Sequence, residues 1–142
     1  MIAIASDHGG FELKEKIKNH LTEKGVEFKD FGTDSESSVS YVPYARAVTR
    51  AIVSKECERG ILVCGTGIGI SIAANRTKGI RAAVCTDAFC CRLTRQHNNA
   101  NVLCMGGRVI GDQLALDLVN IFLTTEFEGG RHLDRITAID DI

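Results

Sequence analysis

Short apolar runs alternate with longer amphipathic segments from one end of the chain to the other. Most runs are too apolar to leave either face of a strand in water, which is typical of strands in a buried parallel sheet. The longer segments carry apolar residues three and four positions apart, as Leu13, Ile17 and Leu21 do, and this spacing predicts helices. The predicted strands are 2–6, 26–31, 60–64, 80–85 and 101–105, and the predicted helices are 11–25, 43–55, 68–76, 87–97, 111–124 and 130–139.

The regular alternation of strands and helices predicts an α/β fold with a single domain over residues 1–142. We expect a three-layer αβα sandwich of the Rossmann-like kind, with a five-stranded, mostly parallel sheet. Ligands of such sheets bind beyond the carboxyl ends of the strands. The polar and glycine-rich segments SDHGG, CGTGIGIS and GGRVIG follow the first, third and fifth predicted strands, so they are the first places to look for a site.

Composition and charge exclude several classes of partner. The 17 Lys and Arg residues nearly balance the 18 Asp and Glu residues, giving a formal net charge of −1. The whole molecule therefore has no electrostatic preference for nucleic acid or for an anionic membrane, and any bound anion must be held by a local cluster. No segment has the apolar length of a membrane span or the pattern of a signal peptide, so we expect a cytoplasmic protein.

The six cysteines form no C-x-x-C pair and no zinc-site spacing, and we predict no metal and no cofactor.

The segment from Cys64 to Ser71 carries the strongest local signal. A predicted strand ends at the cysteine, and three glycines alternate with other residues before a helix begins. Glycines there let successive N–H groups point into one concavity, which binds negative charge at a helix N-terminus. A Rossmann dinucleotide turn would need glycine where the chain has Ile70, and a phosphate-binding P-loop would need a Gly-Lys-Ser/Thr sequence. A thiolate at Cys64 could act as nucleophile or base, but a buried, inert cysteine fits the pattern equally well.

Two pairs with histidine have competing interpretations. Asp7 and His8 directly follow the first strand, where sites form, although Asp7 could simply cap the next helix. His97 and Asn98 end a polar helix, where a histidine is more often plain surface.

Three arginines could bind an anion. Arg131 and Arg135 are four residues apart and so share one helix face, where two guanidinium groups could hold a phosphate. Arg108 follows the fifth strand and is a third candidate. An ordinary solvated surface explains each of them in isolation.

Taken together, these segments resemble the B-type ribose-5-phosphate isomerases, a family that also contains allose- and galactose-6-phosphate isomerases. The resemblance covers essentially the whole chain. It rests on SDHGG at 6–10, ILVCGTGIGISIAANR at 61–76, GIRAAVC at 79–85, RQHNNANVLCMGGRVIG at 95–111 and FEGGRH at 127–132.

The resemblance implies a role for each candidate. Cys64 would be the general base that moves a proton between C2 and C1, Thr66 would move the hydroxyl proton, and His97 would open the furanose ring. Phosphate would be bound by Arg131 and Arg135 with His8 and His132 nearby, and a partner subunit would supply Arg108. The complete set of implied substrate contacts is Asp7, His8, Tyr41, Gly65, Gly67, Ile68, Gly69, Asn98, Arg108, Arg131, His132 and Arg135. The resemblance also implies a homodimer or homotetramer with sites at the subunit interface.

The predicted reaction is the interconversion of ribose 5-phosphate and ribulose 5-phosphate through an enediolate. The chain departs from the family where it reads Ser40-Tyr41-Val42-Pro43-Tyr44-Ala45, because the family's Asp-Tyr-Pro places aspartate at the first position and proline one residue earlier. A six-carbon substrate such as allose or galactose 6-phosphate is therefore the first alternative. His97 favours the pentose. A sugar-phosphate-binding module without catalysis is the second alternative, and Ile70 disfavours a nucleotide-dependent dehydrogenase.

Overall fold

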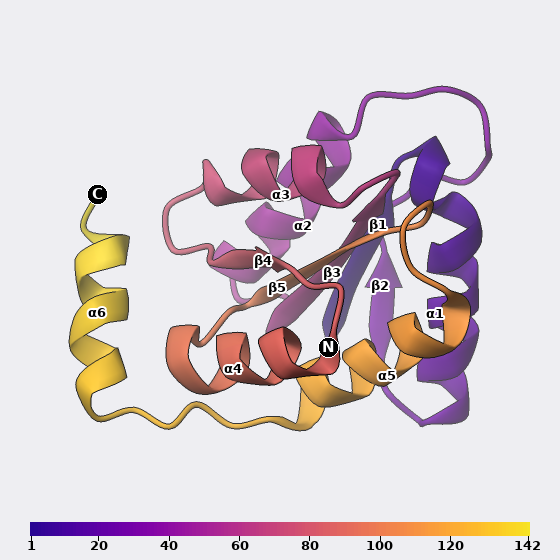
Figure 1. Ribbon diagram of the computed structural model, residues 1–142. Coiled ribbons are helices and arrows are strands. Elements are labelled where there is room, and N and C mark those ends of the chain that lie inside the picture. Colours follow the sequence, from indigo (N-terminus) through magenta and orange to yellow (C-terminus); the bar gives the residue numbers. More distant parts are fainter.

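The computed structural model describes residues 1–142 and consists of one sheet with helices on both faces (Figure 1). The five strands are all parallel and lie in the order β2-β1-β3-β5-β4. The predicted Rossmann-like α/β sandwich with a parallel sheet is therefore confirmed. The strands are β1 (Ile2–Ser6), β2 (Phe28–Asp30), β3 (Arg59–Cys64), β4 (Ala82–Val84) and β5 (Val102–Gly106).

The three central strands, β1, β3 and β5, form the buried middle of the sheet. Their register sets Ser6 beside Val63 and Cys64 beside Gly106, so their carboxyl ends meet at one edge. The outer strands β2 and β4 have only three residues each, and both are partly exposed, with Val84 at 37%. The prediction of strands buried on both faces holds for the three central strands and not for these two, which lie at the edges of the sheet.

Two helical layers cover the sheet. The hydrophobic core against one face draws on α1, α4 and α5, and the core against the other face draws on α2 and α3. The helices are α1 (Phe11–Glu23), α2 (Val42–Val53), α3 (Ile68–Asn75), α4 (Ala88–Asn98), α5 (Asp112–Thr124) and α6 (Arg131–Asp140), with a short 3-10 helix η1 (His8–Gly10) before α1. Each predicted helix is present with bounds shifted by one or two residues. None of the six has both the length and the apolar character needed to cross a bilayer.

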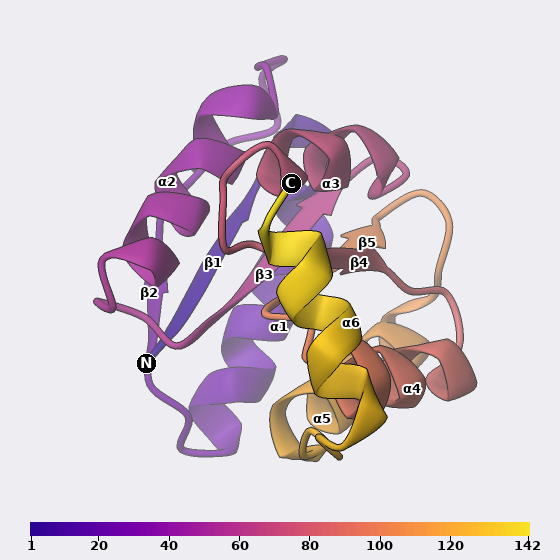
Figure 2. The ribbon, with the colours of Figure 1, turned by 90° about the vertical axis from the view of Figure 1, so that its left-hand side faces the viewer.

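Helix α6 belongs to neither layer. It lies beside α4, outside the sheet on the side where β4 and β5 begin (Figures 1 and 2). Only His132 and Ile136 of this helix are buried. The three-layer prediction did not anticipate a helix with so little contact to the body of the protein.

Candidate functional site

The carboxyl ends of β1, β3 and β5 are drawn together by close backbone contacts at glycines. Gly67 has φ +81°, and a Cβ there would lie 2.8 Å from the carbonyl carbon of Met105. A Cβ on Gly106 would lie 2.7 Å from the carbonyl carbon of Thr66. Only glycine fits at such distances, so the turn between β3 and α3 lies directly against the end of β5.

Cys64 is the last residue of β3 and is 4% exposed. The N–H of Gly67, which caps the N-terminus of α3, donates a hydrogen bond to its Sγ at 3.1 Å. A hydrogen-bond donor at a helix N-terminus stabilises a thiolate more than a thiol. The predicted contact between this thiol and the glycine-rich turn is therefore present.

Thr66 and Tyr41 flank the same turn. The Ile68 N–H donates to Thr66 Oγ1 at 3.2 Å, so the hydroxyl oxygen is an acceptor here and its own proton is free for an outside partner. The ring of Tyr41 lies over the turn, because a Cβ on Gly69 would be 2.6 Å from Tyr41 Cζ. The unusual segment around Pro43 thus still brings Tyr41 to the site.

Asp7 and His8 begin the turn after β1. Asp7 Oδ1 accepts the N–H of Gly10 at 3.2 Å and caps η1, so the capping interpretation of Asp7 is correct. His8 Nδ1 lies 3.1 Å from the Val39 nitrogen and 3.2 Å from the Val39 carbonyl oxygen, so it can accept from the first or donate to the second. A neutral His8 that accepts from the Val39 N–H carries its proton on Nε2, the nitrogen left free for a ligand.

Arg108 lies over the glycine-rich turn of its own chain. A Cβ on Gly65 would be 3.2 Å from Arg108 Nη1, and the Arg108 N–H bonds the Gly65 carbonyl at 3.0 Å. Contrary to the expectation, this turn therefore does not need an arginine from a partner subunit. A cavity of about 440 Å³ opens beside it, lined by His8, Gly9, Glu12, Leu13, Lys16, Glu36, Gly107, Arg108 and Asp112.

A second cluster contains the remaining predicted site residues. The rings of His97 and His132 are stacked, with centroids 4.2 Å apart and 10° between their planes. Burial, aided by the charges of His97 and Arg131, lowers the pKa of His132 below its ordinary value, so it is neutral at neutral pH. Arg131 and Arg135 lie on α6 as predicted, and both are exposed.

The two clusters lie at opposite ends of the sheet. Cys64 pairs with Gly106 at the carboxyl end of β5, whereas α4 runs antiparallel to the strands and delivers His97 to the amino end. The four residue steps of β5 alone separate these ends by about 13 Å. Figure 1 shows α6 on the opposite side of the sheet from the turns that follow β1, β3 and β5. One chain therefore does not bring His97 to Cys64, nor His8 to Arg131, and the site implied by the resemblance cannot form within a single chain.

Glu128 was not predicted from the sequence, and it completes a group of possible metal ligands. Ligand atoms of His97, Glu128 and His132 all lie within 4.8 Å of one another. The lone pair of an imidazole nitrogen lies in the plane of its ring, so two parallel rings direct their lone pairs side by side rather than at one point. An ion could bind both histidines only after one ring had rotated, and the stacked pair is therefore not preorganised for a metal.

Comparison with known proteins identifies the family. The model of the Ribose/Galactose Isomerase family matches residues 2–139. The chain belongs to this family. Among its relatives, ribose-5-phosphate isomerase B of Escherichia coli is 50% identical over 99% of this chain and 95% of its own length. A putative sugar phosphate isomerase of Bacillus subtilis is 52% identical with the same coverage.

Solved structures of the family have the same fold. The ribose 5-phosphate isomerase of Thermotoga maritima superimposes with a TM-score of 0.98 at 57% identity, covering 99% of this chain and 97% of that one. The ribose-5-phosphate isomerase B of Mycoplasma genitalium, with bound ribulose-5-phosphate, gives a TM-score of 0.94 at 40% identity, covering 99% and 93%. The resemblance seen in the sequence motifs is confirmed.

Proposed function

We propose that the protein interconverts ribose 5-phosphate and ribulose 5-phosphate, with Cys64 as the general base. The relatives named for this reaction match almost the whole chain, and one of them was solved with the ketose product bound. The observation that carries the assignment of the base is the 3.1 Å contact between Cys64 Sγ and the Gly67 N–H, at the edge of the sheet where ligands bind.

The reaction needs a base, a proton shuttle and stabilisation of one oxyanion. The Cys64 thiolate removes the proton from C2 of the open aldose, and the C–H electron pair becomes the C1–C2 double bond while the carbonyl oxygen takes up negative charge. Main-chain amides of the turn from Gly65 to Gly69 stabilise that oxygen. Thr66 passes the hydroxyl proton from O2 to O1, and the thiol returns its proton to C1. The electrons stay within the substrate, so these steps require no cofactor.

Ring opening and phosphate binding are assigned to the second cluster. His97 moves the proton of the anomeric O1 hydroxyl to the ring oxygen as the bond between C1 and the ring oxygen breaks, which leaves the open aldehyde. Arg131 and Arg135 bind the phosphate with His132 beside them. Because this cluster lies at the far end of the sheet from Cys64, a complete site needs the second cluster of another chain. We infer a homodimer in which each site joins the Cys64 end of one subunit to the α6 end of the other, and two such dimers could form a homotetramer. Arg108 stays with the Cys64 of its own chain in this arrangement.

The remaining assignments follow from the site and from the thiols. The partner is a small sugar phosphate, and neither nucleic acid nor a membrane is part of the proposal. All six cysteines are unpaired, and five are buried. Free thiols suit the reducing cytoplasm, where we place the enzyme.

The test is exchange of the C2 proton of ribose 5-phosphate in deuterated water. Cys64→Ala should fold and still bind the sugar phosphate, but lose exchange and turnover by at least about a thousandfold, because the variant lacks the group assigned to take the C2 proton. Cys90→Ala is the matched control, because Cys90 is the exposed thiol and lies on α4. An active Cys64→Ala variant would show that the base is misassigned. A higher kcat/KM on allose or galactose 6-phosphate than on ribose 5-phosphate would overturn the pentose assignment.

A further inference from the structure

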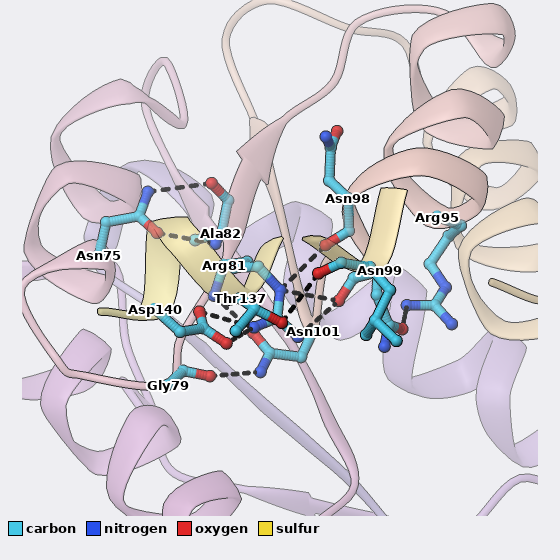
Figure 3. Close-up of polar contacts among 11 residues, drawn as sticks. Asn75, Gly79, Arg81, Ala82, Arg95, Asn98, Asn99, Asn101, Thr137 and Asp140 are labelled. Carbon is cyan, nitrogen blue, oxygen red and sulfur yellow. Dashed lines mark hydrogen bonds and ion pairs between the residues drawn. The ribbon is translucent and has the colours of Figure 1, made fainter. Parts of the chain in front are cut away.

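Arg81 joins two parts of the chain that carry the second cluster. Its Nε donates to the carbonyl oxygen of Asn98 at 2.9 Å, and its Nη2 donates to that of Asn99 at 3.2 Å. Its Nη1 contacts both carboxylate oxygens of Asp140, at 2.8 and 2.6 Å (Figure 3). One guanidinium group, with a side chain only 15% exposed, therefore ties the end of α4 to the end of α6.

Within one chain, few other contacts hold α6 in place. Leu133 and Ile139 are 52% and 49% exposed, and Ile136 is the one buried aliphatic residue of the helix. The helix is thus attached at three levels: the His132 stack near its beginning, Ile136 in its middle, and the Arg81 ion pair at its end.

The geometry of a helix makes the ion pair important at the distant arginines. With a rise of about 1.5 Å per residue, Asp140 lies ~6 Å beyond Ile136 along the axis, and Arg131 lies ~7.5 Å before it. A rigid helix held only at His132 and Ile136 can still turn about the line that joins these two residues, and the exposed side chains of Arg131 and Arg135 turn with it. Loss of the contact with Asp140 therefore leaves the orientation of the two arginines less fixed.

The structure leaves room for such a movement. A cavity of about 470 Å³ lies under the end of α6, and its lining includes Thr94, Ile139 and Asp140. Two polar side chains around it are paired within the protein: Asn75 both donates to and accepts from the backbone of Ala82, at 3.0 and 2.8 Å, and Thr77 donates to Thr49 Oγ1 at 3.1 Å. The cavity gives the end of α6 space to move once the ion pair is broken.

We propose that Arg81 is a positioning residue, which holds α4 and α6 as one rigid unit so that His97 and the arginines of α6 meet the substrate in a fixed arrangement. Asp140 is its partner on α6. The kinetic part of this inference rests on the proposed function, and the part that concerns phosphate rests only on the anion-binding role proposed for the α6 arginines. No step of the reaction is assigned to Arg81 itself.

The variants Asp140→Asn and Arg81→Lys distinguish the contact of Arg81 with α6 from its contacts with the end of α4. Asp140→Asn weakens only the link to α6, so KM for ribose 5-phosphate should rise about tenfold with kcat within about twofold. Arg81→Lys cannot bond all three partners at once and also frees the chain beside His97, so kcat should fall as well. Asp141→Asn removes the same charge one residue away, outside the ion pair, and should change neither parameter. Asp140→Glu keeps the charge and should stay within about threefold of the wild-type KM.

A second measurement keeps this inference distinguishable from the proposed function. Titration of the assembled protein with inorganic phosphate in a calorimeter should show about tenfold weaker binding for Asp140→Asn, while its thermal unfolding temperature stays above the assay temperature. Equal phosphate affinity in Asp140→Asn and the wild type would overturn the positioning role, as would equal impairment by Asp140→Glu. If the wild type fails to isomerise ribose 5-phosphate but Asp140→Asn still weakens phosphate binding, the proposed function fails and the positioning role stands.

Discussion

The ring of His97 lies parallel to the ring of His132 at a centroid distance of 4.2 Å. This stack joins the residue assigned to ring opening with the helix assigned to phosphate binding. It also places His132 where burial and nearby positive charge keep it neutral.

The pH dependence of stability should reflect this environment of His132. Its pKa is lowered from the ordinary 6.5, so below pH 6.5 the unfolded chain binds a proton that the folded chain does not. Between the lowered pKa and pH 6.5, stability therefore decreases as the pH is lowered and increases as the pH is raised. His132→Gln should reduce this loss, measured as the difference in urea midpoint between pH 7.5 and pH 5.5. His20→Gln, a histidine that bonds Asn120 on a different part of the surface, is the control and should keep the wild-type difference.

Gly67→Ala should disturb both folding and catalysis. The substitution puts a Cβ at φ +81° and 2.8 Å from the carbonyl carbon of Met105, which should cost about 2–3 kcal/mol of stability. It also displaces the N–H that bonds Cys64, so turnover should fall more than stability explains. Gly25→Ala is the matched control, because Gly25 has φ +70° with no atom within 4 Å of the added Cβ. A Gly67→Ala variant with wild-type kcat would contradict the assigned role of this amide.

Breaking the ion pair between Lys14 and Asp30 should destabilise the fold. Lys14 is fully buried and contacts Asp30 at 2.8 Å, so Asp30→Asn leaves a buried charge with weaker partners. We expect a loss of about 2 kcal/mol at pH 7, below the range for fully buried pairs because the Asp30 side chain is 24% exposed. Urea denaturation checks this value. Glu56→Gln, which breaks the exposed pair with Lys29, should have a much smaller effect.

The difference in stability between the wild type and Asp30→Asn should depend on pH. Burial raises the pKa of Asp30, but hydrogen bonds from Lys14, Lys18 and the Gly32 N–H outweigh it, and the net shift is below the ordinary 3.8. The stabilisation by the carboxylate is thus complete above that value and is lost as the pH falls through the lowered pKa. Wild type and Asp30→Asn should therefore converge in stability only in strong acid. Convergence already near pH 5 would contradict the lowered pKa.

Two inactive variants should complement each other if sites are shared between subunits. Cys64→Ala and His97→Ala each damage both sites of a homodimer, but a mixed dimer has one intact site and one site with both defects. Random exchange should restore about a quarter of wild-type activity, because half of the dimers are mixed and each has one working site of two. The assay mixes the two purified variants, exchanges subunits and measures turnover. No recovery despite demonstrated exchange would place the whole site within one chain.

Local patterns predicted the fold and the Cys64 end of the site well. Cys64, Thr66 and the glycines are consecutive, so a strand, a turn and a helix N-terminus fix their arrangement without distant information. Asp7 and His8 reach the same edge because parallel strands end together. The bounds of the central strands were predicted closely, since their apolar runs are buried on both faces.

Features that depend on distant segments were not predicted. His97 lies at the opposite end of the sheet from Cys64 because of the direction of α4. Motif matching alone assigns the two residues to the same site. The pairing of Arg81 with Asp140 joins residues 59 positions apart and has no local signal. The exposure of β2 and β4 depends on strand order, which hydrophobic patterns do not encode.

The distance between the two clusters has a consequence for how substrate size can change. In the proposed dimer, the gap between the proton-transferring thiol and the phosphate-binding arginines is set by how two subunits dock, not by the fold of either one. A small shift at the docking surface would lengthen or shorten that gap while every group keeps its local surroundings. Sugars with one more or one fewer carbon thus become accessible through changes far from the reacting atoms.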